Sequence, residues 1–332
     1  MLDSYKKHVD ERAELNIPPL PLDADQTLEL VSLLKEKNND PDYLLNLLKE
    51  RVPAGVDQAA YVKAAFLADI TTGNASSPYI SKIDAVEILG TMLGGYNVEP
   101  LIRCLEIEEL AETASHVLGR TLLIFDAFNE IFELSKKNKY AKKVIEEWAD
   151  AKWFTEKEDI KDQIKLTVFK VSGEINTDDL SPAPDAWSRP DIPLHALAMF
   201  KMPRTGLDDP LGTIEKLKEK GNPLVFVGDV VGTGSSRKSA TNSVLWHMGD
   251  EIPHIPNKKE GGYCFGGKIA PIFFNTLEDS GAFPVEMDVS KMLMGQEIIL
   301  EPLKGKVIDA NTNETLSKFK LKTDVLLDEV RA

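Results

Sequence analysis

The sequence contains only two cysteines among its 332 residues, Cys104 and Cys264, and they lie far apart along the chain. Two distant cysteines exclude a disulfide framework and a CxxC metal motif. No apolar run is long enough to span a bilayer, and the charged opening residues, MLDSYKKHVDERAELN, lack the apolar core of a signal peptide. These absences predict a cytoplasmic protein that has no membrane partner.

Basic residues are outnumbered, with 39 Lys and Arg against 54 Asp and Glu, which gives a formal net charge of −15. Residues 1–150 hold 16 basic and 26 acidic side chains, so −10 of this charge lies there. This balance disfavours general polyanion binding, because phosphate neutralisation needs clustered Lys and Arg. The basic run SKKNKYAKK (135–143) is predicted to be a solvated helix face, and residues 136–143 are the best local candidate for contact with a polyanion.

The first half of the chain has the periodicity of helices about a dozen residues long, separated by short breaks. Asp40 and Asp57 are predicted helix caps, and Ser81 with Asp84 forms a capping-box pattern. Such helices in antiparallel pairs are typical of an α-solenoid of the HEAT or armadillo type. We therefore predict an all-α, HEAT-like domain over 1–158. Its expected helices are 40–52, 56–70, 81–93, 98–118, 121–136 and 139–151.

The periodicity changes near residue 160, where IKLTVFKVSG alternates in the manner of a strand. The short apolar run NPLVFVGD is typical of a buried parallel strand. We predict an α/β domain over 159–332, with its chemistry at the carboxyl ends of the strands. Its expected strands are 164–173, 222–229, 266–276 and 283–289, and its expected helices are 192–202, 211–220 and 235–248.

The stretch GDVVGTGSSRKSATNSVLWHMG (228–249) places glycines, serines and an arginine in one turn before a helix. Gly232 and Gly234 permit backbone conformations closed to other residues. Ser235 is predicted to cap the helix, and the free N–H groups at a helix start attract a carboxylate or phosphate. Arg237 adds a forked donor suited to a carboxylate. The alternative is a glycine turn with a serine cap and no ligand.

A second polar loop, GEINTDDLSPAPDAWSRPD (173–191), follows the strand at 164–173. Its acidic residues are either turn formers or site residues, since aspartate stabilises turns through its own backbone. Because both polar loops follow strands of one domain, we expect Arg189 and Arg237 to face one exposed cleft. Trp187 is predicted to pack. Structural roles are predicted for the histidines, which lack metal-ligand spacing: His8, His116, His195, His247 and His254.

Together these stretches resemble the aconitase family. TDDLSPAPDAWSR resembles the T-D-x-I-S segment of the family's mobile swivel domain, and GTGSSRKSATNSVLW resembles its G-x-G-S-S-R segment. GGKIAPIFFNTLEDSGAFP is similar to the strand–loop–strand of the same domain. A helical domain followed by a swivel, ahead of a catalytic core, resembles the bacterial B branch of the family. The resemblance implies a β/β/α swivel domain of the aconitase C-terminal type over 159–332.

The resemblance also implies a hydro-lyase that interconverts citrate and isocitrate through cis-aconitate, with 2-methylisocitrate left open as another substrate. Ser235 matches the catalytic base and a substrate contact. Ser236, Arg237 and Arg189 match residues that bind the tricarboxylate. Asp178 and Ser181 match supporting residues. Asp179 replaces a histidine that is common in the mitochondrial type, which leaves its role open.

The family's 4Fe–4S cluster is held by three cysteine thiolates, two of them closely spaced. Cys104 and Cys264 are each without such a partner and are expected to be buried apolar residues. The resemblance therefore implies no metal ligands in this chain and places the cluster in core domains beyond it. We expect an N-terminal part of a larger enzyme that is inactive by itself.

Two other hypotheses remain. In the first, the chain is a non-catalytic interaction module that forms a homodimer or binds mRNA through its helical domain. In the second, it is a subunit of a split hydro-lyase similar to isopropylmalate isomerase. The charge of the helical half disfavours strong RNA binding. The long helical half and the segment SPAPDAWSRPD argue against the split subunit.

Overall fold

The computed structural model describes residues 2–93, 95–121, 127–235 and 237–332. The chain divides into two compact units, Met1–Lys157 with Pro253–Pro256 and Glu158–Ile252 with Asn257–Ala332. Each unit has its own buried apolar core. Among the described residues, no helix combines the length and apolarity that crossing a bilayer would require.

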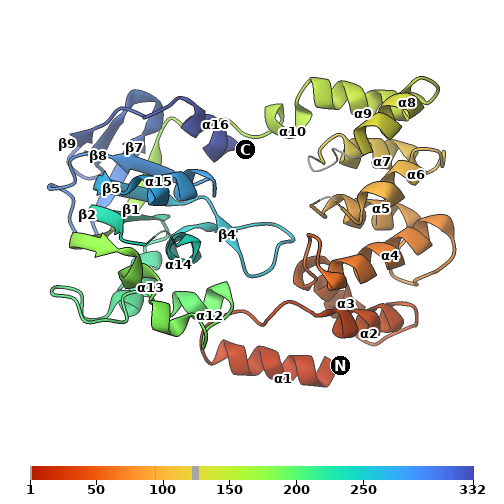
Figure 1. Ribbon diagram of the computed structural model, residues 1–332, viewed down its shortest axis with the longest axis horizontal. Coiled ribbons are helices and arrows are strands. Elements are labelled where there is room, and N and C mark those ends of the chain that lie inside the picture. The colour runs from red at the N-terminus through yellow and green to blue at the C-terminus, as the bar shows by residue number, and fades with distance from the viewer. Residues whose placement is uncertain (1, 94, 122–126, 236) are drawn as a thin grey trace. The chain divides into compact units, whose positions relative to one another are not determined.

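The first unit is helical, and Figure 1 shows its helices running from red to yellow-green. Neighbouring helices pack on one another in sequence, with α2 on α4, α4 on α5, α5 on α7 and α7 on α9. A short π-helix, Leu47–Arg51, follows α3 directly. The other elements are α1 (Leu2–Ala13), α2 (Ala24–Leu34), α3 (Pro41–Asn46), α4 (Gln58–Thr72), α5 (Lys82–Gly90), α6 (Val98–Cys104), α7 (Ala111–Leu118), α8 (Phe128–Ser135), α9 (Lys139–Ala149) and α10 (Lys152–Thr155).

Several helix starts follow the sequence signals. The Asp57 side chain accepts a hydrogen bond from the Ala59 N–H at 2.8 Å, and Ser81 with Asp84 forms the predicted capping box. The helix predicted over 98–118 is instead two helices, α6 and α7, with turns between them. Part of the helix predicted over 121–136, residues 122–126, lies outside the described residues.

The second unit is built on a seven-stranded mixed sheet in the order β6-β5-β2-β1-β7-β8-β9. Strands β1, β2, β5 and β6 are parallel, and β7, β8 and β9 continue the sheet antiparallel. These strands are β1 (Ile164–Asn176), β2 (Leu224–Thr233), β5 (Tyr263–Ile269), β6 (Phe283–Glu286), β7 (Glu297–Glu301), β8 (Lys306–Asp309) and β9 (Thr315–Lys318). The pair β3 (Asp250–Glu251) and β4 (Lys259–Glu260) forms a separate small ribbon.

Alternation along the central strands gives the sheet a core on each face. Phe169 and Phe226 belong to one cluster, which the helices on that face complete, while Val168 and Val225 belong to the other. Successive side chains of a strand point to opposite faces, so both faces of these strands are buried. The helices of the second unit, on both faces of the sheet, are α11 (Thr177–Leu180), α12 (Ile192–Ala196), α13 (Pro210–Lys218), α14 (Lys238–Met248), α15 (Pro271–Glu278) and α16 (Val325–Arg331).

The strand predicted over 266–276 is wrong in its second half. Strand β5 ends at Ile269, and the residues from Pro271 onward form α15, which buries Phe273 and Phe274. Proline fits the first turn of a helix because the N–H that it lacks would be unpaired there anyway. A short run of apolar residues suits a strand and a buried helix equally.

The sheet places the two polar loops side by side. β1 and β2 are neighbouring parallel strands, and Asn176 at the end of β1 pairs with Thr233 at the end of β2. Parallel strands end at the same edge of a sheet, so the segments that follow them meet there. The segment after Asn176 is the loop 177–191, and the segment after Thr233 leads into α14.

Candidate functional site

The turn after β1 is stabilised by its own polar side chains. The Asn176 side chain accepts from the Asp179 N–H at 2.9 Å, and the Asp179 carboxylate accepts from the Asn176 N–H at 2.9 Å. Arg204 donates from Nη1 to the same carboxylate at 3.2 Å. Asp179, whose role the sequence leaves open, therefore forms a capping box and an ion pair that fix the turn.

The turn after β2 requires glycine at two positions. Gly232 has φ +76° and Gly234 has φ +91°, and a Cβ at Gly232 would lie 2.3 Å from Cγ of Phe273. Thr177 then ties this turn to the other loop, because its Oγ1 donates to the Ser235 carbonyl at 2.8 Å. Ser236, which the resemblance assigns to substrate binding, lies outside the described residues.

The structure corrects the predicted helix cap. Helix α14 begins at Lys238, and its N-cap position is Arg237, with no side-chain capping bond. Ser235 lies two residues before this cap, because the glycine turn extends further than the sequence pattern suggests. Its side chain is exposed, and among the described residues its hydroxyl has no hydrogen-bond partner. The hydroxyl is therefore not occupied by a capping role.

Arg237 is held by the loop after β1. Its Nη1 donates to Oδ1 of Asp178 and, at 3.1 Å, to the Ser181 carbonyl. The hydrogen bond from Arg237 lowers the pKa of Asp178 below its usual value. The Arg237 side chain keeps 23% of its surface exposed, so the ion pair orients the guanidinium without removing it from solvent.

Arg189 is held in a similar way within its own loop. Its Nε donates to Oδ1 of Asp185 at 3.3 Å, and its Nη1 donates to the Leu194 carbonyl at 3.1 Å. Lys201 also donates to Asp185, at 2.8 Å, and this bond and the Lys201 and Arg189 charges keep the pKa of Asp185 low. The Arg189 side chain is 29% exposed.

The two arginines line separate cavities, not the single cleft that the sequence analysis predicts. Arg237 and Ser235 line a cavity of about 180 Å³, whereas Arg189 lines one of about 230 Å³ between α12 and α14. Both guanidiniums are held by carboxylates of the loop after β1, Arg237 by Asp178 and Arg189 by Asp185, so each lies beside a different part of that loop. The two cavities come closest at the start of α14, where the N-cap residue Arg237 lines the first and Ser239 lines the second.

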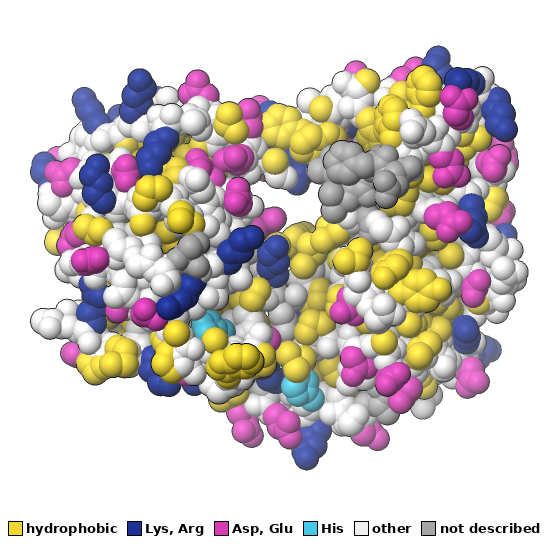
Figure 2. Space-filling model, in the orientation of Figure 1, with side chains coloured by type: hydrophobic (Ala, Val, Ile, Leu, Met, Phe, Trp, Pro, Cys, Tyr) yellow, Lys and Arg dark blue, Asp and Glu magenta, His cyan; other side chains and the backbone are white. Residues whose placement is uncertain are grey.

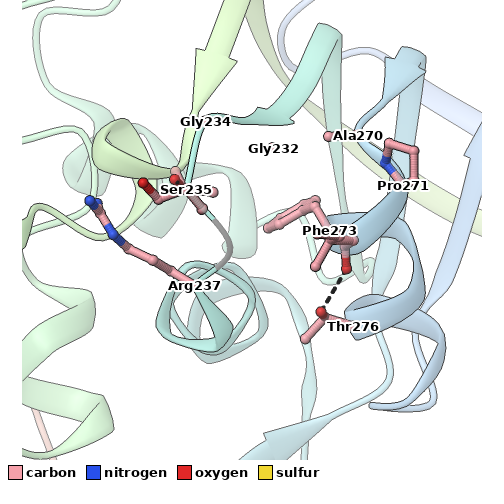
Figure 3. Close-up of a pocket in the computed structure, with 10 residues that line it drawn as sticks. Gly232, Gly234, Ser235, Arg237, Ala270, Pro271, Phe273 and Thr276 are labelled. Carbon is pink, nitrogen blue, oxygen red and sulfur yellow. Dashed lines mark hydrogen bonds between the residues drawn. The ribbon is translucent and has the colours of Figure 1, made fainter.

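Figure 3 shows how the first cavity is built. Ser235 stands between Arg237, which comes from the start of α14, and Phe273, which comes from α15. The Arg237 guanidinium extends away from Phe273 toward the loop after β1. The cavity therefore has a polar wall and an apolar wall, with a hydroxyl between them.

Replacing Gly232 with alanine is expected to destabilise the second unit by about 2 kcal/mol, because the residue is in the left-handed region and a Cβ would clash with Phe273. Urea unfolding of both proteins measures this difference. Gly206→Ala serves as the matched control: Gly206 has φ +79°, but a Cβ added there would meet no atom within 4 Å, so it isolates the backbone term. An equal loss in both variants would contradict the clash.

Sequence reasoning missed the part played by His195. This histidine lines the second cavity with Arg189, and its Nε2 lies 2.8 Å from Oγ of Ser181. No spacing rule could have paired them, since fourteen residues and an irregular loop separate the two. The prediction that Trp187 packs is wrong: its side chain is 95% exposed, because the loop that carries it turns the indole outward.

The cysteines do not fit a 4Fe–4S cluster. Cys104 is buried in the helical unit, and Cys264 is buried in β5, where burial raises the pKa of its thiol to about 12. Cluster ligands are thiolates, so an isolated thiol that resists ionisation is unsuited to the role. Among the described residues, no group of three or more His, Cys, Asp or Glu side chains could hold a metal ion.

The basic run 136–143 is largely paired with acid. Figure 2 shows basic and acidic side chains intermixed on the face in view. Because Lys136, Lys142 and Lys143 are paired with glutamates, the run forms no continuous basic patch of the kind that a polyanion needs. Its ion pairs include Lys136–Glu133 at 2.6 Å, Lys142–Glu146 at 3.5 Å and Lys143–Glu112 at 2.5 Å.

Comparison with known proteins identifies the family. The family described as aconitate hydratase 2 N-terminus matches residues 166–332, and the aconitate B N-terminal domain matches residues 4–154. Aconitate hydratase B of Escherichia coli is 58% identical over the whole chain, that of Pseudomonas aeruginosa 57%, and that of Helicobacter pylori 49%. The chain covers 39%, 39% and 38% of these relatives, respectively.

Among solved structures, 3-isopropylmalate dehydratase from Methanocaldococcus jannaschii overlays on 49% of this chain and 85% of its own, with a TM-score of 0.37 and 20% identity. The family matches cover both units, and the relatives align along the entire chain. The chain thus spans about two fifths of the length of the curated relatives it matches. It belongs to the aconitate hydratase 2 N-terminal family.

Proposed function

We propose that this chain is the N-terminal part of an aconitate hydratase that interconverts citrate and isocitrate through cis-aconitate. The observation that carries the proposal is the identity of 49–58% with aconitate hydratase B along the whole chain. The site is consistent with it, because an exposed hydroxyl stands beside an oriented guanidinium at the start of a helix. In this proposal residues 1–158 are a HEAT-like domain and residues 159–332 are the swivel domain.

The arginines bind carboxylates of the substrate. Within the described residues the hydrogen bonds of the Arg237 side chain use only Nη1, so its Nε and Nη2 remain available to a ligand. Nη2 of Arg189 is available in the same sense. A planar guanidinium donates two parallel hydrogen bonds to one carboxylate, and two of them suit a tricarboxylate. Asp178 and Ser181 support this binding by fixing the Arg237 side chain.

Ser235 is the catalytic base. Its Oγ, as an alkoxide, accepts the proton from the carbon next to a substrate carboxylate, and the electrons of that C–H bond form the double bond. The hydroxyl of the adjacent carbon leaves with its bonding pair and becomes water by taking a proton from a general acid of the complete enzyme. A serine acts as a base only where its alkoxide is stabilised. The positive end of α14 and the Arg237 guanidinium are the groups placed to do so.

The complete enzyme carries a 4Fe–4S cluster in this proposal, and the cluster supplies an iron that acts as a Lewis acid toward the substrate. Its ligands belong to the part of the relatives' length that this chain does not cover, since Cys104 and Cys264 do not fit the role. The contribution of this chain is the base, the carboxylate contacts and the turns that hold them.

The direct test supplies the chain with the remaining length of an aconitate hydratase B and follows the ultraviolet absorbance of cis-aconitate. Arg237→Lys is expected to raise KM roughly tenfold or more, because an ammonium cannot reproduce the forked contact. Lys238→Arg, on the neighbouring side chain, is the control and should leave KM unchanged. An Arg237→Lys enzyme with the original KM would overturn the assignment of this residue.

A further inference from the structure

The Ser181 hydroxyl is a buried junction that connects three elements. Ser181 follows α11, and its Oγ lies 2.8 Å from Nε2 of His195 on α12 and 2.6 Å from Oγ of Ser239 on α14. Ser181 is 2% exposed and His195 is 8% exposed. Buried polar groups of this kind are costly unless every member is paired, so the three side chains define one another's positions.

The proton arrangement of this junction is limited by chemistry. A serine hydroxyl donates one hydrogen bond and accepts others. When the Ser181 hydrogen also stays within the junction, Ser181 either accepts from the His195 Nε2–H and donates to Ser239, or accepts from Ser239 and donates to Nε2. Both arrangements need a nitrogen at the Nε2 position. A ring without that nitrogen leaves a buried hydroxyl short of a partner.

The same residue also holds the proposed substrate arginine. The Ser181 carbonyl accepts from Nη1 of Arg237 at 3.1 Å. A shift of Ser181 would therefore move an acceptor of Arg237. Ser239 lies two residues after Arg237, so the junction fixes both the acceptor and the start of the helix that carries the donor.

His195 is itself held at a fixed place. The neighbouring Ala196 carbonyl accepts from Nε2–H of His247 at 3.0 Å, which fastens α12 to α14 a second time. Burial lowers the pKa of His247 to about 4, so its ring is neutral at physiological pH and keeps a single donor for this bond. This bond fixes the backbone of α12 directly beside His195.

We propose that His195 is a positioning residue that acts through Ser181 to fix the Arg237 guanidinium. The proposal rests on the proposed function for the role of Arg237, but the geometry that carries it is the chain of contacts from Nε2 through Ser181 to Arg237. His195 also lines the second cavity, so it connects the surroundings of Arg189 with those of Arg237.

The first test reads the order of Arg237 directly, in the 332-residue chain. The Arg237 Nε–Hε resonance is followed by ¹⁵N relaxation in the unchanged protein, in His195→Gln, whose side-chain amide nitrogen stands in for Nε2, and in His195→Phe. Arg237 should be ordered in the first two and at least twofold more mobile in the third. Unchanged order in His195→Phe would overturn the proposal.

The second test measures affinity for propane-1,2,3-tricarboxylate, a substrate analogue without a hydroxyl, by titration calorimetry. His195→Phe is expected to weaken binding about tenfold, and His195→Gln should restore it. Adding His195→Phe to Arg237→Lys should weaken binding no further, because residues that act through one group are not additive. Independent, additive losses would show that His195 does not act through Arg237.

Ser115→Ala is the matched control. Ser115 is fully buried in the helical unit, and its hydroxyl donates to the Tyr140 carbonyl at 3.0 Å. This variant should lower the melting temperature without changing Arg237 order or analogue affinity. If the unchanged chain does not bind the analogue, the proposed function loses support, whereas the relaxation measurement still decides the role of His195.

Discussion

Replacing Ser235 with alanine is expected to lower the rate of cis-aconitate formation from citrate by about a thousandfold, in the complete enzyme assembled with this chain. The expected size follows from the range of roughly 10² to 10⁴ that a positioned acid or base contributes. The loss should appear in kcat, because the Ser235 side chain is proposed to accept the proton in the chemical step and not to strengthen substrate binding. The measurement is steady-state kinetics of cis-aconitate formation from citrate.

Two controls distinguish loss of the base from loss of folding. The Ser235 side chain caps no helix in the structure, so Ser235→Ala should melt within a degree or two of the unchanged protein. Ser32→Ala removes an exposed hydroxyl that bonds only its own helix and should retain full activity. Retention of more than a tenth of the activity by Ser235→Ala would rule out this serine as the base.

Replacing Lys63 with methionine is expected to stabilise the helical unit by about 3 kcal/mol at pH 7. Lys63 lies in α4 with none of its side chain exposed, and among the described residues its ammonium has no hydrogen-bond partner. Burial lowers the pKa of this lysine from 10.5 to about 8, although Glu50 nearby opposes the shift. Each pKa unit corresponds to about 1.4 kcal/mol, and methionine fills a similar volume without the charge.

The lysine also predicts a dependence on pH. Between pH 8 and 10.5 the unfolded chain holds a proton on this amine that the folded chain has lost, so stability should rise with pH across that window. Below pH 8 both states carry the charge, so stability does not depend on this proton there and the full cost of burying the ammonium remains. Urea unfolding followed by far-ultraviolet circular dichroism at pH 7 and pH 10 measures both effects.

Methionine at position 63 should remove this rise, whereas Lys49→Met, on an exposed neighbour, should change stability by less than about 0.5 kcal/mol, as is usual for surface positions. A Lys63→Met protein less stable than the original would show that the ammonium has a favourable partner in solution. A rise between pH 8 and 10 that persists in the variant would assign that rise to other groups.

Much of the fold follows from local signals in the sequence. The switch from helical to alternating periodicity near residue 160 predicts a helical region followed by a region built on a sheet, and the structure has both. Caps such as Ser81 with Asp84 follow from side-chain chemistry within a few residues. The segment 271–278 could not be assigned this way, because packing of Phe273 and Phe274 against the sheet decides it.

The site divides in the same manner. Asp185 and Arg189 are four residues apart, so their ion pair can be predicted from the local sequence. Arg237 and Asp178 are brought together by the pairing of β1 with β2, and no local pattern reports a partner 59 residues away. The separation of the two arginines into two cavities depends on these pairs, which explains why the sequence points to a single cleft.

The pairing of Asn176 with Thr233 at the ends of β1 and β2 determines which segments of this protein can change in length. Adding or deleting one residue within either strand would displace one turn by about 3.3 Å and reverse the faces of its side chains. Lengthening the chain at the exposed tip around Gly206 would leave both strand ends where they are. Natural variation in length should therefore accumulate in that connection, while the two strands keep a fixed count.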